Sequence, residues 1–327
     1  MTVGCLTATL FAVVAVPSLA DDKPAAKTSG GGTTGTSPPA PVANRPKVPG
    51  ALRLHLRSRE ETAPKSGEFK PVERVSDWKP SQTAIIICDM WNNHYCQLAA
   101  QRVDAMAPRM NEVVTAARNH GVMIIHAPSG TMDQYAGTPH RQRMQQARKF
   151  EPSVPLKPWC HLDPSKEPEI PIDVSKQSCD DPVVGPAVKV FDRQHAAIKI
   201  IGYDGVSDSG DEIYNFLRQE GITHVVLMGV HTNMCVLGRP FGIRQMKNLG
   251  FHVALARDLT DAMYDPRQPP YVSHTRGTEL VIEHIEKYWC PSLLGEDLTR
   301  VVPGSADPMP TSPAEPSTRA ATTGSGK

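Results

Sequence analysis

The feature that most constrains the fold is a series of short, uniformly apolar segments separated by amphipathic ones. Two of them are TAIIIC at Thr83–Cys88 and ITHVVLMGV at Ile222–Val230. A strand that is apolar along its whole length is typical of a parallel sheet with helices on both faces. Further strands are predicted at residues 122–126, 196–201 and 251–256. Helices are predicted at residues 99–119, from Cys235 to Asn248 and at 274–288, and one more helix is predicted to begin after a cap at Ser207 or Asp208. This alternation predicts an α/β fold with a doubly wound, mostly parallel sheet, whose ligands bind at the carboxyl ends of the strands.

Both ends of the chain differ in composition from this central part. Residues 7–20, TATLFAVVAVPSLA, are apolar, too short to span a bilayer and end in small residues, which predicts a signal peptide over residues 1–20 and an exported, periplasmic or extracellular protein. Residues 21–49 and 304–327 are rich in Pro, Gly, Ser and Thr and are predicted to be a disordered linker and a disordered tail. The folded domain is therefore predicted to span residues 50–303, with a Pro-rich insertion at 127–189 placed to cover a site.

Charge and cysteine content narrow the class of protein. The net charge is +1 and the basic residues are dispersed, which argues against nucleic acid or an anionic membrane as partner and favours a small-molecule substrate. Six cysteines remain after the predicted signal peptide, and in an oxidising compartment thiols tend to pair. Cys160 and Cys179 bracket a Pro-rich segment, so we predict a disulfide between them, with Cys96–Cys290 as a second pair.

Three polar residues lie where this architecture places a site. Asp89 directly follows the strand at Thr83–Cys88, Lys199 interrupts the apolar run AIKII, and Cys235 lies at a turn from strand to helix. A thiol at a helix start is close to unpaired backbone N–H groups, which favour the thiolate, and a lysine adds to this effect. An aspartate can take the thiol proton and return it to a leaving amine. Taken singly, each residue has a plain structural interpretation: a helix cap, an exposed strand lysine and a small packing residue.

The combination resembles the isochorismatase-like cysteine hydrolases. The segment GVHTNMCV at Gly229–Val236 resembles the nucleophile signature of that superfamily, TAIIICDM resembles its opening strand with the catalytic aspartate, and AIKII resembles the strand with its lysine. The resemblance implies that Cys235 attacks a carbonyl carbon to form a thioester, with Asp89 as base and then acid and Lys199 as the cation. The implied reaction is cleavage of a C–N bond in a small amide or ureido compound.

The same resemblance implies further features. A cis peptide bond is expected at Val230–His231, which would aim the backbone N–H of His231 at the same point as that of Cys235 and form an oxyanion hole. Association into a homo-oligomer is expected by the same analogy. No cofactor or metal is predicted, because the Asp-x-His motif of the metal-binding nicotinamidases is missing; His126 and His140 remain possible ligands but are more simply read as solvated loop residues.

The substrate pocket is less constrained by sequence. Trp91 and His94, shortly after Asp89, either line the pocket mouth or pack near a helix start. Arg239, one turn beyond Cys235, could bind a substrate carboxylate, whereas Arg244 could equally be structural and His274 is better explained as a cap or loop residue.

Three alternative functions stay open at this stage. One is a vinyl-ether hydrolase of the isochorismate type, which does not need a thiol nucleophile. Another is a non-catalytic exported binding module, which would not need a base, a cation and a thiol at three strand ends. The last is redox chemistry at Cys235, for which Cys88 is the one candidate resolving cysteine because no Cys-x-x-Cys motif is present.

Overall fold

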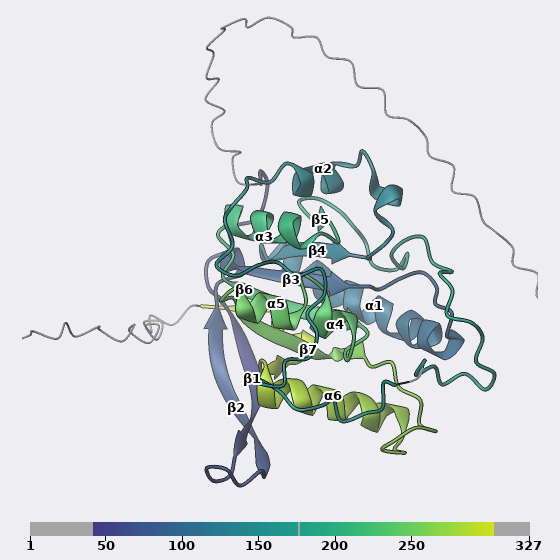
Figure 1. Ribbon diagram of the computed structural model, residues 1–327. Coiled ribbons are helices and arrows are strands. Elements are labelled where there is room, and N and C mark those ends of the chain that lie inside the picture. Colours follow the sequence, from purple (N-terminus) through teal and green to yellow (C-terminus); the bar gives the residue numbers. More distant parts are fainter. Residues whose placement is uncertain (1–41, 176, 304–327) are drawn as a thin grey trace, which may run out of the picture. The chain divides into compact units, whose positions relative to one another are not determined.

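A single mixed sheet organises the domain. The computed structural model describes residues 42–175 and 177–303, and its sheet has nine strands in the order β2-β1-β8-β7-β6-β3-β4-β5, with β9 paired to β1 (Figure 1). The central strands run parallel: β7 (His252–Asp261), β6 (His224–Val230), β3 (Thr83–Cys88), β4 (Met123–Ala127) and β5 (Gly205–Val206). The short β8 (Ser292–Leu293) is parallel to β7. The predicted doubly wound, mostly parallel α/β fold is confirmed.

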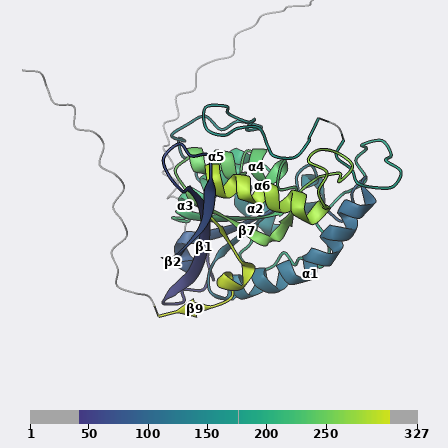
Figure 2. The ribbon, with the colours of Figure 1, turned by 90° about the horizontal axis from the view of Figure 1, so that it is seen from below.

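Helices cover both faces of the sheet, and the central strands are therefore buried on both sides. Ile85 and Ile87 of β3 pack with the face of α1 (Gln97–Asn119), whereas Ala84 and Ile86 point the other way. The opposite face carries α3 (Gly210–Gln219), α4 (Cys235–Gly238), α5 (Ile243–Asn248) and α6 (His274–Tyr288). Figure 2 shows α1 on one side of the sheet and α4, α5 and α6 on the other. The short helices η1 (Pro80–Gln82), η2 (Met132–Tyr135), α2 (Pro139–Gln145) and η3 (Gly295–Leu298) lie in the connections.

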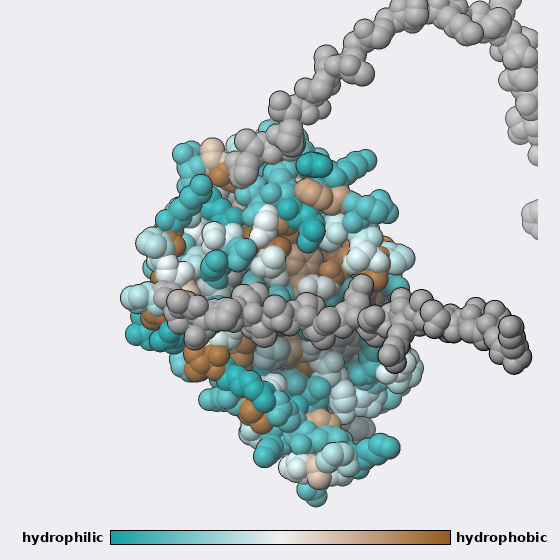
Figure 3. All heavy atoms as spheres, turned by 90° about the vertical axis from the view of Figure 1, so that its left-hand side faces the viewer, coloured by the Kyte–Doolittle hydropathy of each residue, from teal (hydrophilic) through white to brown (hydrophobic). Residues whose placement is uncertain are grey.

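An antiparallel hairpin, which was not predicted from the sequence, extends the sheet at one edge. β1 (Ala51–Glu61) pairs with β2 (Phe69–Trp78) over ten residue pairs, and β9 (Val301–Val302) joins the other edge of β1. Leu52 and Leu54 are fully buried and alternate with exposed polar residues, which is the period-2 pattern of a half-exposed strand. Figure 3 views this side of the domain, where hydrophilic side chains predominate.

The ends of the domain differ in part from the prediction. Residues 42–49 belong with the domain rather than with a disordered linker, since Arg45 donates hydrogen bonds from Nε to the Gly121 carbonyl and from Nη2 to the Ser81 carbonyl. The predicted signal peptide, the rest of the linker and the tail from residue 304 lie outside the described residues. Within the described ranges, no helix has the length and apolar character needed to cross a bilayer.

The predicted strand at 196–201 is wrong. These residues form turns and irregular structure, Ile201 is 47% exposed, and the chain joins the sheet only at β5, where Val206 is fully buried and pairs with His126. The helix that follows is capped by Ser209 rather than by Ser207 or Asp208, since the Ser209 side chain accepts a hydrogen bond from the Glu212 N–H.

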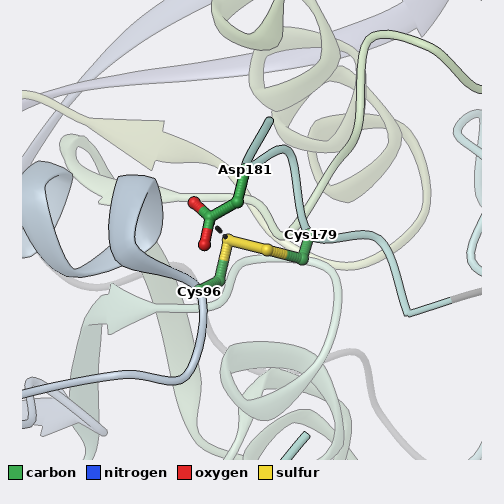
Figure 4. Close-up of side chains that lie close together, drawn as sticks. All are labelled: Cys96, Cys179 and Asp181. Atoms are coloured by element: carbon green, nitrogen blue, oxygen red, sulfur yellow. Dashed lines mark hydrogen bonds between the residues drawn. A yellow bond between two sulfur atoms is a disulfide. The ribbon is translucent and has the colours of Figure 1, made fainter. Parts of the chain in front are cut away.

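Ala127 ends β4, and the described residues of the insertion that follow, 128–175 and 177–189, form no strand; a disulfide whose predicted pairing was wrong fixes this segment. Cys179 is bonded to Cys96, the residue before α1, and not to Cys160 (Figure 4). Cys160 is a buried free thiol whose backbone N–H donates to the Gly238 carbonyl, so it lies beside α4 instead. Cys290 is also a buried free thiol, which excludes the second predicted pair. The Asp181 carboxylate lies beside the disulfide and accepts hydrogen bonds from the backbone N–H groups of Gln97 and Leu98 at the start of α1.

Candidate active site

Asp89 occupies the carboxyl end of β3 and is completely buried. Its backbone adopts φ 48°, a left-handed conformation that Asp tolerates better than most residues. The neighbouring strand β6 reaches this point through Gly229, where a Cβ atom would lie only 2.1 Å from the Cys88 carbonyl oxygen. The glycine thus lets the loop after β6 approach the residue that follows β3. Asp89 Oδ1 accepts a hydrogen bond of 2.8 Å from the Ser129 backbone N–H, which fixes the carboxylate.

Arg239 forms an ion pair with Asp89. Its Nε donates a hydrogen bond to Asp89 Oδ2 at 3.1 Å, its Nη2 lies 3.0 Å from the same oxygen, and its side chain is 27% exposed. The backbone explains this direction: Pro240 disfavours a helical conformation at the residue before it, and Arg239 has ψ 156°. The helix predicted from Cys235 to Asn248 is therefore broken into α4 and α5, and Arg239 turns toward the end of β3. The guanidinium also lies 5.6 Å from the centre of the Trp159 ring.

Cys235 begins α4 and is 8% exposed, next to Asp89 and Arg239. Burial raises the pKa of its thiol well above the ordinary value, and the Asp89 carboxylate adds to this rise, while the Arg239 guanidinium and a backbone hydrogen bond from His231 act in the opposite direction. Burial also raises the pKa of Asp89, although Arg239 opposes that shift. Because α4 has only four residues, its macrodipole is a minor factor, in contrast to the expectation from sequence. A neutral thiol beside a buried carboxylate of raised proton affinity is an arrangement suited to proton transfer between the two.

The loop from Val230 to Met234 supplies backbone donors to the thiol. The peptide bond Val230–His231 is cis, as the resemblance implied, and the backbone N–H of His231 is the donor that acts on the Cys235 sulfur. The His231 side chain points into the protein, where burial lowers its pKa to about 3. His231, His94 and Asp89 line a small cavity of about 10 Å³, roughly the space of one water molecule.

Lys199 is not part of this arrangement. Its side chain is exposed and Nζ donates to the Ala196 carbonyl, three residues earlier in the chain. The backbone on both sides is held by α1, since the Lys199 N–H donates to the Asn111 side chain and its carbonyl accepts from Arg118. The neighbouring Ile198 packs in the cluster on the α1 face, whereas Cys235 packs on the opposite face. The cation beside Asp89 is therefore Arg239 and not the predicted lysine.

Trp91 and His94 have mainly structural contacts. The Trp91 ring stacks on Phe191 with 4.1 Å between ring centres, and its Nε1 donates to the Ser129 carbonyl. His94 accepts a hydrogen bond at Nδ1 from the Cys96 N–H, and its ring meets that of His231 edge-on at 5.1 Å. Both residues support the loop around Asp89 instead of forming an open pocket mouth.

His126 and His140, the two histidines considered as metal ligands, form no hydrogen bond or ion pair with Cys235 or Asp89 in the part of the chain that the structure describes. His126 is fully buried, and its ring nitrogens lie 3.0 Å from Gln194 Oε1 and 3.0 Å from Asp204 Oδ2. His140 is a half-buried residue of α2. Cys96, Cys179 and Asp181 are the one group of His, Cys, Asp or Glu side chains within residues 42–175 and 177–303 that lie close enough to share a metal ion, and both sulfurs of that group are in the disulfide.

Comparison with known proteins finds a family model that matches the segment with Cys235 and Arg239. Residues 175–272, which include Lys199, Cys235 and Arg239, match the model of the isochorismatase domain. The predicted family resemblance is confirmed. A curated relative, the ureidoacrylate amidohydrolase RutB of Klebsiella pneumoniae, is 26% identical over 170 residues, covering 48% of this chain and 65% of the relative. The chain thus spans about 65% of the length of the curated relatives it matches.

Solved structures give weaker similarities of the same kind. A cysteine hydrolase from Pseudomonas syringae pv. phaseolicola has 17% identity and a TM-score of 0.42, with 70% of this chain and 96% of that chain covered. An N-carbamoylsarcosine amidase from Thermoplasma acidophilum has 14% identity and a TM-score of 0.33, with 66% and 97% covered.

The ion pair at the centre of the site was not predicted from the sequence. Arg239 was predicted near Cys235 as a residue that could bind a substrate carboxylate, but not as the partner of Asp89. The signal that could have found it is Pro240, which ends the helix just after Arg239 and frees its side chain from the helix surface.

Proposed function

We propose that this protein is a cysteine-dependent hydrolase that cleaves a C–N bond of a small amide or ureido compound. The observation that carries the proposal is the group formed by Cys235, Asp89 and Arg239: a nucleophile and a cation on the segment that follows β6, and a base directly after the adjacent strand β3. The match to the isochorismatase domain and the name of the curated amidohydrolase relative support the same class of reaction.

The first half of the reaction transfers an acyl group to the sulfur. As the Cys235 sulfur bonds to the carbonyl carbon, Asp89 takes the thiol proton, and Arg239 lies where it can balance the negative charge that moves between the two groups. The oxygen that becomes negative is met by the backbone N–H groups of His231 and Cys235, at the first helical residue, where N–H groups lack an intrahelical acceptor. The C–N bond then breaks, and Asp89 gives its proton to the departing nitrogen.

The second half releases the product by hydrolysis. A water molecule donates a proton to Asp89 as its oxygen attacks the thioester carbon, the C–S bond breaks, and the proton returns to the Cys235 sulfur. A carboxylic acid leaves and the enzyme is restored. Every step uses groups of this chain, so we propose that the reaction needs no cofactor.

The test uses matched cysteine variants. Wild-type protein, Cys235→Ala and Cys160→Ala are incubated with small amides and ureido acids, while ammonia release and intact mass are measured. Cys160 is the control because it is also a buried free thiol, away from Asp89. We expect Cys235→Ala alone to abolish ammonia release and the acyl adduct. Turnover that persists in Cys235→Ala would refute the proposal, and would favour a reaction that needs no thiol, such as vinyl-ether hydrolysis; binding without turnover in the wild type would favour a binding module.

We further propose that the protein is exported. The Cys96–Cys179 disulfide supports this, because disulfides persist in oxidising compartments and are rare in the cytosol. The mature protein should begin at Asp21, which the mass of the purified natural protein will test. Light scattering on the same sample will test the expected homo-oligomer.

A further inference from the structure

A second cavity lies beside the loop that precedes Cys235, and it is separate from the small cavity that Asp89 lines. It measures about 310 Å³ and lies between the insertion and the loop before Cys235. One wall is formed by Asn233 and Met234, the two residues that precede Cys235. Its volume is at the lower end of the range of small-molecule sites, which is roughly 300–1,000 Å³.

Trp159 connects this cavity to the catalytic group. Its ring lines the cavity, lies 5.6 Å from the Arg239 guanidinium carbon and packs so closely on Gly238 that a Cβ atom there would come within 2.6 Å of the ring. The next residue, Cys160, donates its backbone N–H to the Gly238 carbonyl at 2.7 Å. The insertion is thus attached to α4, and the cavity lies beside the two residues that precede Cys235.

The cavity is apolar inside and acidic at its rim. Apolar side chains line much of it: Trp159, Leu162, Ile170, Val174 and Met234. Val174 and Met234 are 48% and 43% exposed, so both side chains are accessible to a ligand in the cavity.

Of the charged side chains that line the cavity, Arg244 has an ion-pair partner and Glu169 has none among the described residues. The Arg244 guanidinium pairs with Glu167, with Nε to Oε1 at 2.6 Å, although its Nη2 is buried without a hydrogen-bond partner; Glu169 is exposed and forms no ion pair within the part of the chain that the structure describes. With the Arg244–Glu167 pair counted as neutral, Glu169 leaves a formal negative charge at the cavity, which disfavours an anionic ligand.

The proposed mechanism indicates which part of a substrate would occupy the cavity. In the proposed mechanism the leaving nitrogen receives its proton from Asp89, so it must lie on the Asp89 side of the sulfur. The acyl group stays bonded to Cys235, and the two residues before Cys235, Asn233 and Met234, line the cavity.

From these observations we propose that the cavity is the acyl-group pocket, and that the preferred substrate is an amide whose acyl group is bulky, apolar and uncharged or cationic. The inference rests on the proposed function and narrows it: short acyl groups and acyl groups with a carboxylate are poor substrates. Val174, Met234 and Trp159 are then the residues that determine specificity.

The experiment compares acetamide with 3-phenylpropionamide, and the para-carboxy with the para-aminomethyl derivative of the latter. Ammonia release gives kcat/KM for the wild type, Val174→Trp and Val188→Trp. Val174→Trp fills the cavity from an exposed position, and Val188→Trp is the control because Val188 is similarly exposed, at 51%, on the same insertion but outside the cavity. Titration calorimetry with Cys235→Ala measures binding of the same amides without turnover.

We expect 3-phenylpropionamide to exceed acetamide by at least about tenfold in kcat/KM, and Val174→Trp to remove that advantage by lowering kcat/KM for 3-phenylpropionamide far more than for acetamide, since an apolar pocket discriminates by roughly 10- to 200-fold. Val188→Trp should behave as the wild type, and the carboxylate derivative should be the poorest of the aromatic amides. Equal kcat/KM values in the wild type, a Val174→Trp effect on both substrates alike, a preference for the carboxylate or absence of binding to Cys235→Ala would each overturn the inference. If Cys235→Ala still hydrolyses the amides, the proposed function fails instead.

Discussion

Replacing Arg239 by methionine tests whether this arginine is the cation of the catalytic group. Asp89 is fully buried, and its Oδ2 accepts a charged hydrogen bond from Arg239 Nε at 3.1 Å and lies 3.0 Å from Nη2 in the same ion pair. Removing one partner of a buried ion pair costs about 3–5 kcal/mol, because the remaining charge is left without compensation. Lys199→Met is the matched control, since it also replaces a cation by methionine at the exposed position that the sequence analysis had chosen.

The loss of stability in Arg239→Met should depend on pH. Burial already raises the pKa of Asp89, and without the guanidinium this pKa rises further. Below the raised pKa the carboxyl group is protonated and neutral, so its burial costs less. We therefore expect urea unfolding to show the full destabilisation of about 3 kcal/mol or more at pH 8 and a smaller one at pH 5, with about 1.4 kcal/mol for each unit of pKa difference.

The activity should fall with the stability. We expect kcat/KM of Arg239→Met to drop about 100-fold or more, in the range seen when a charge-stabilising donor is removed from an active site. Lys199→Met should stay within about 0.5 kcal/mol of the wild type in stability, as is usual for exposed substitutions, and retain its activity. The reasoning is refuted if Lys199→Met is the more damaging change, or if Arg239→Met unfolds like the wild type at pH 8.

Three further predictions concern the surroundings of the site. Burial lowers the pKa of His274, but hydrogen bonds with Asp180 and Asp261 outweigh it and raise the pKa to about 9, above the ordinary 6.5. Its contribution of about 3 kcal/mol should be complete below pH 6.5 and be lost as the pH rises to 9, so the difference in unfolding free energy between the wild type and His274→Asn should shrink over that range; a constant difference would contradict this. The Cys96–Cys179 disulfide closes a separation of 83 residues, so replacing both cysteines by alanine should cost about 4 kcal/mol, and an unchanged urea midpoint would argue against the bond. Dialysis against EDTA should leave ammonia release unchanged, and a loss that zinc restores would show that a metal is required.

Much of the central sheet could be predicted from sequence because burial on both faces leaves a strong pattern. The strand Thr83–Cys88 and the helix His274–Tyr288 have the predicted bounds. The run AIKII at 197–201, in the predicted strand 196–201, has the same composition as a buried strand but forms none, because composition does not record which neighbour a segment packs against. Here the backbone of Lys199 is bonded to α1 through Asn111 and Arg118.

The sequence by itself determined the parallel α/β architecture, the resemblance to isochorismatase-like hydrolases and the positions of Asp89 and Cys235, since each follows a strand whose apolar pattern is local. The tertiary structure alone decided which cation stands beside Asp89 and which cysteine pairs with Cys179. Both are contacts between segments far apart in the chain, 150 residues for Arg239 with Asp89 and 83 for the disulfide. Their existence depends on the direction in which the backbone leaves a strand or a helix, and the types of the residues alone do not fix that direction.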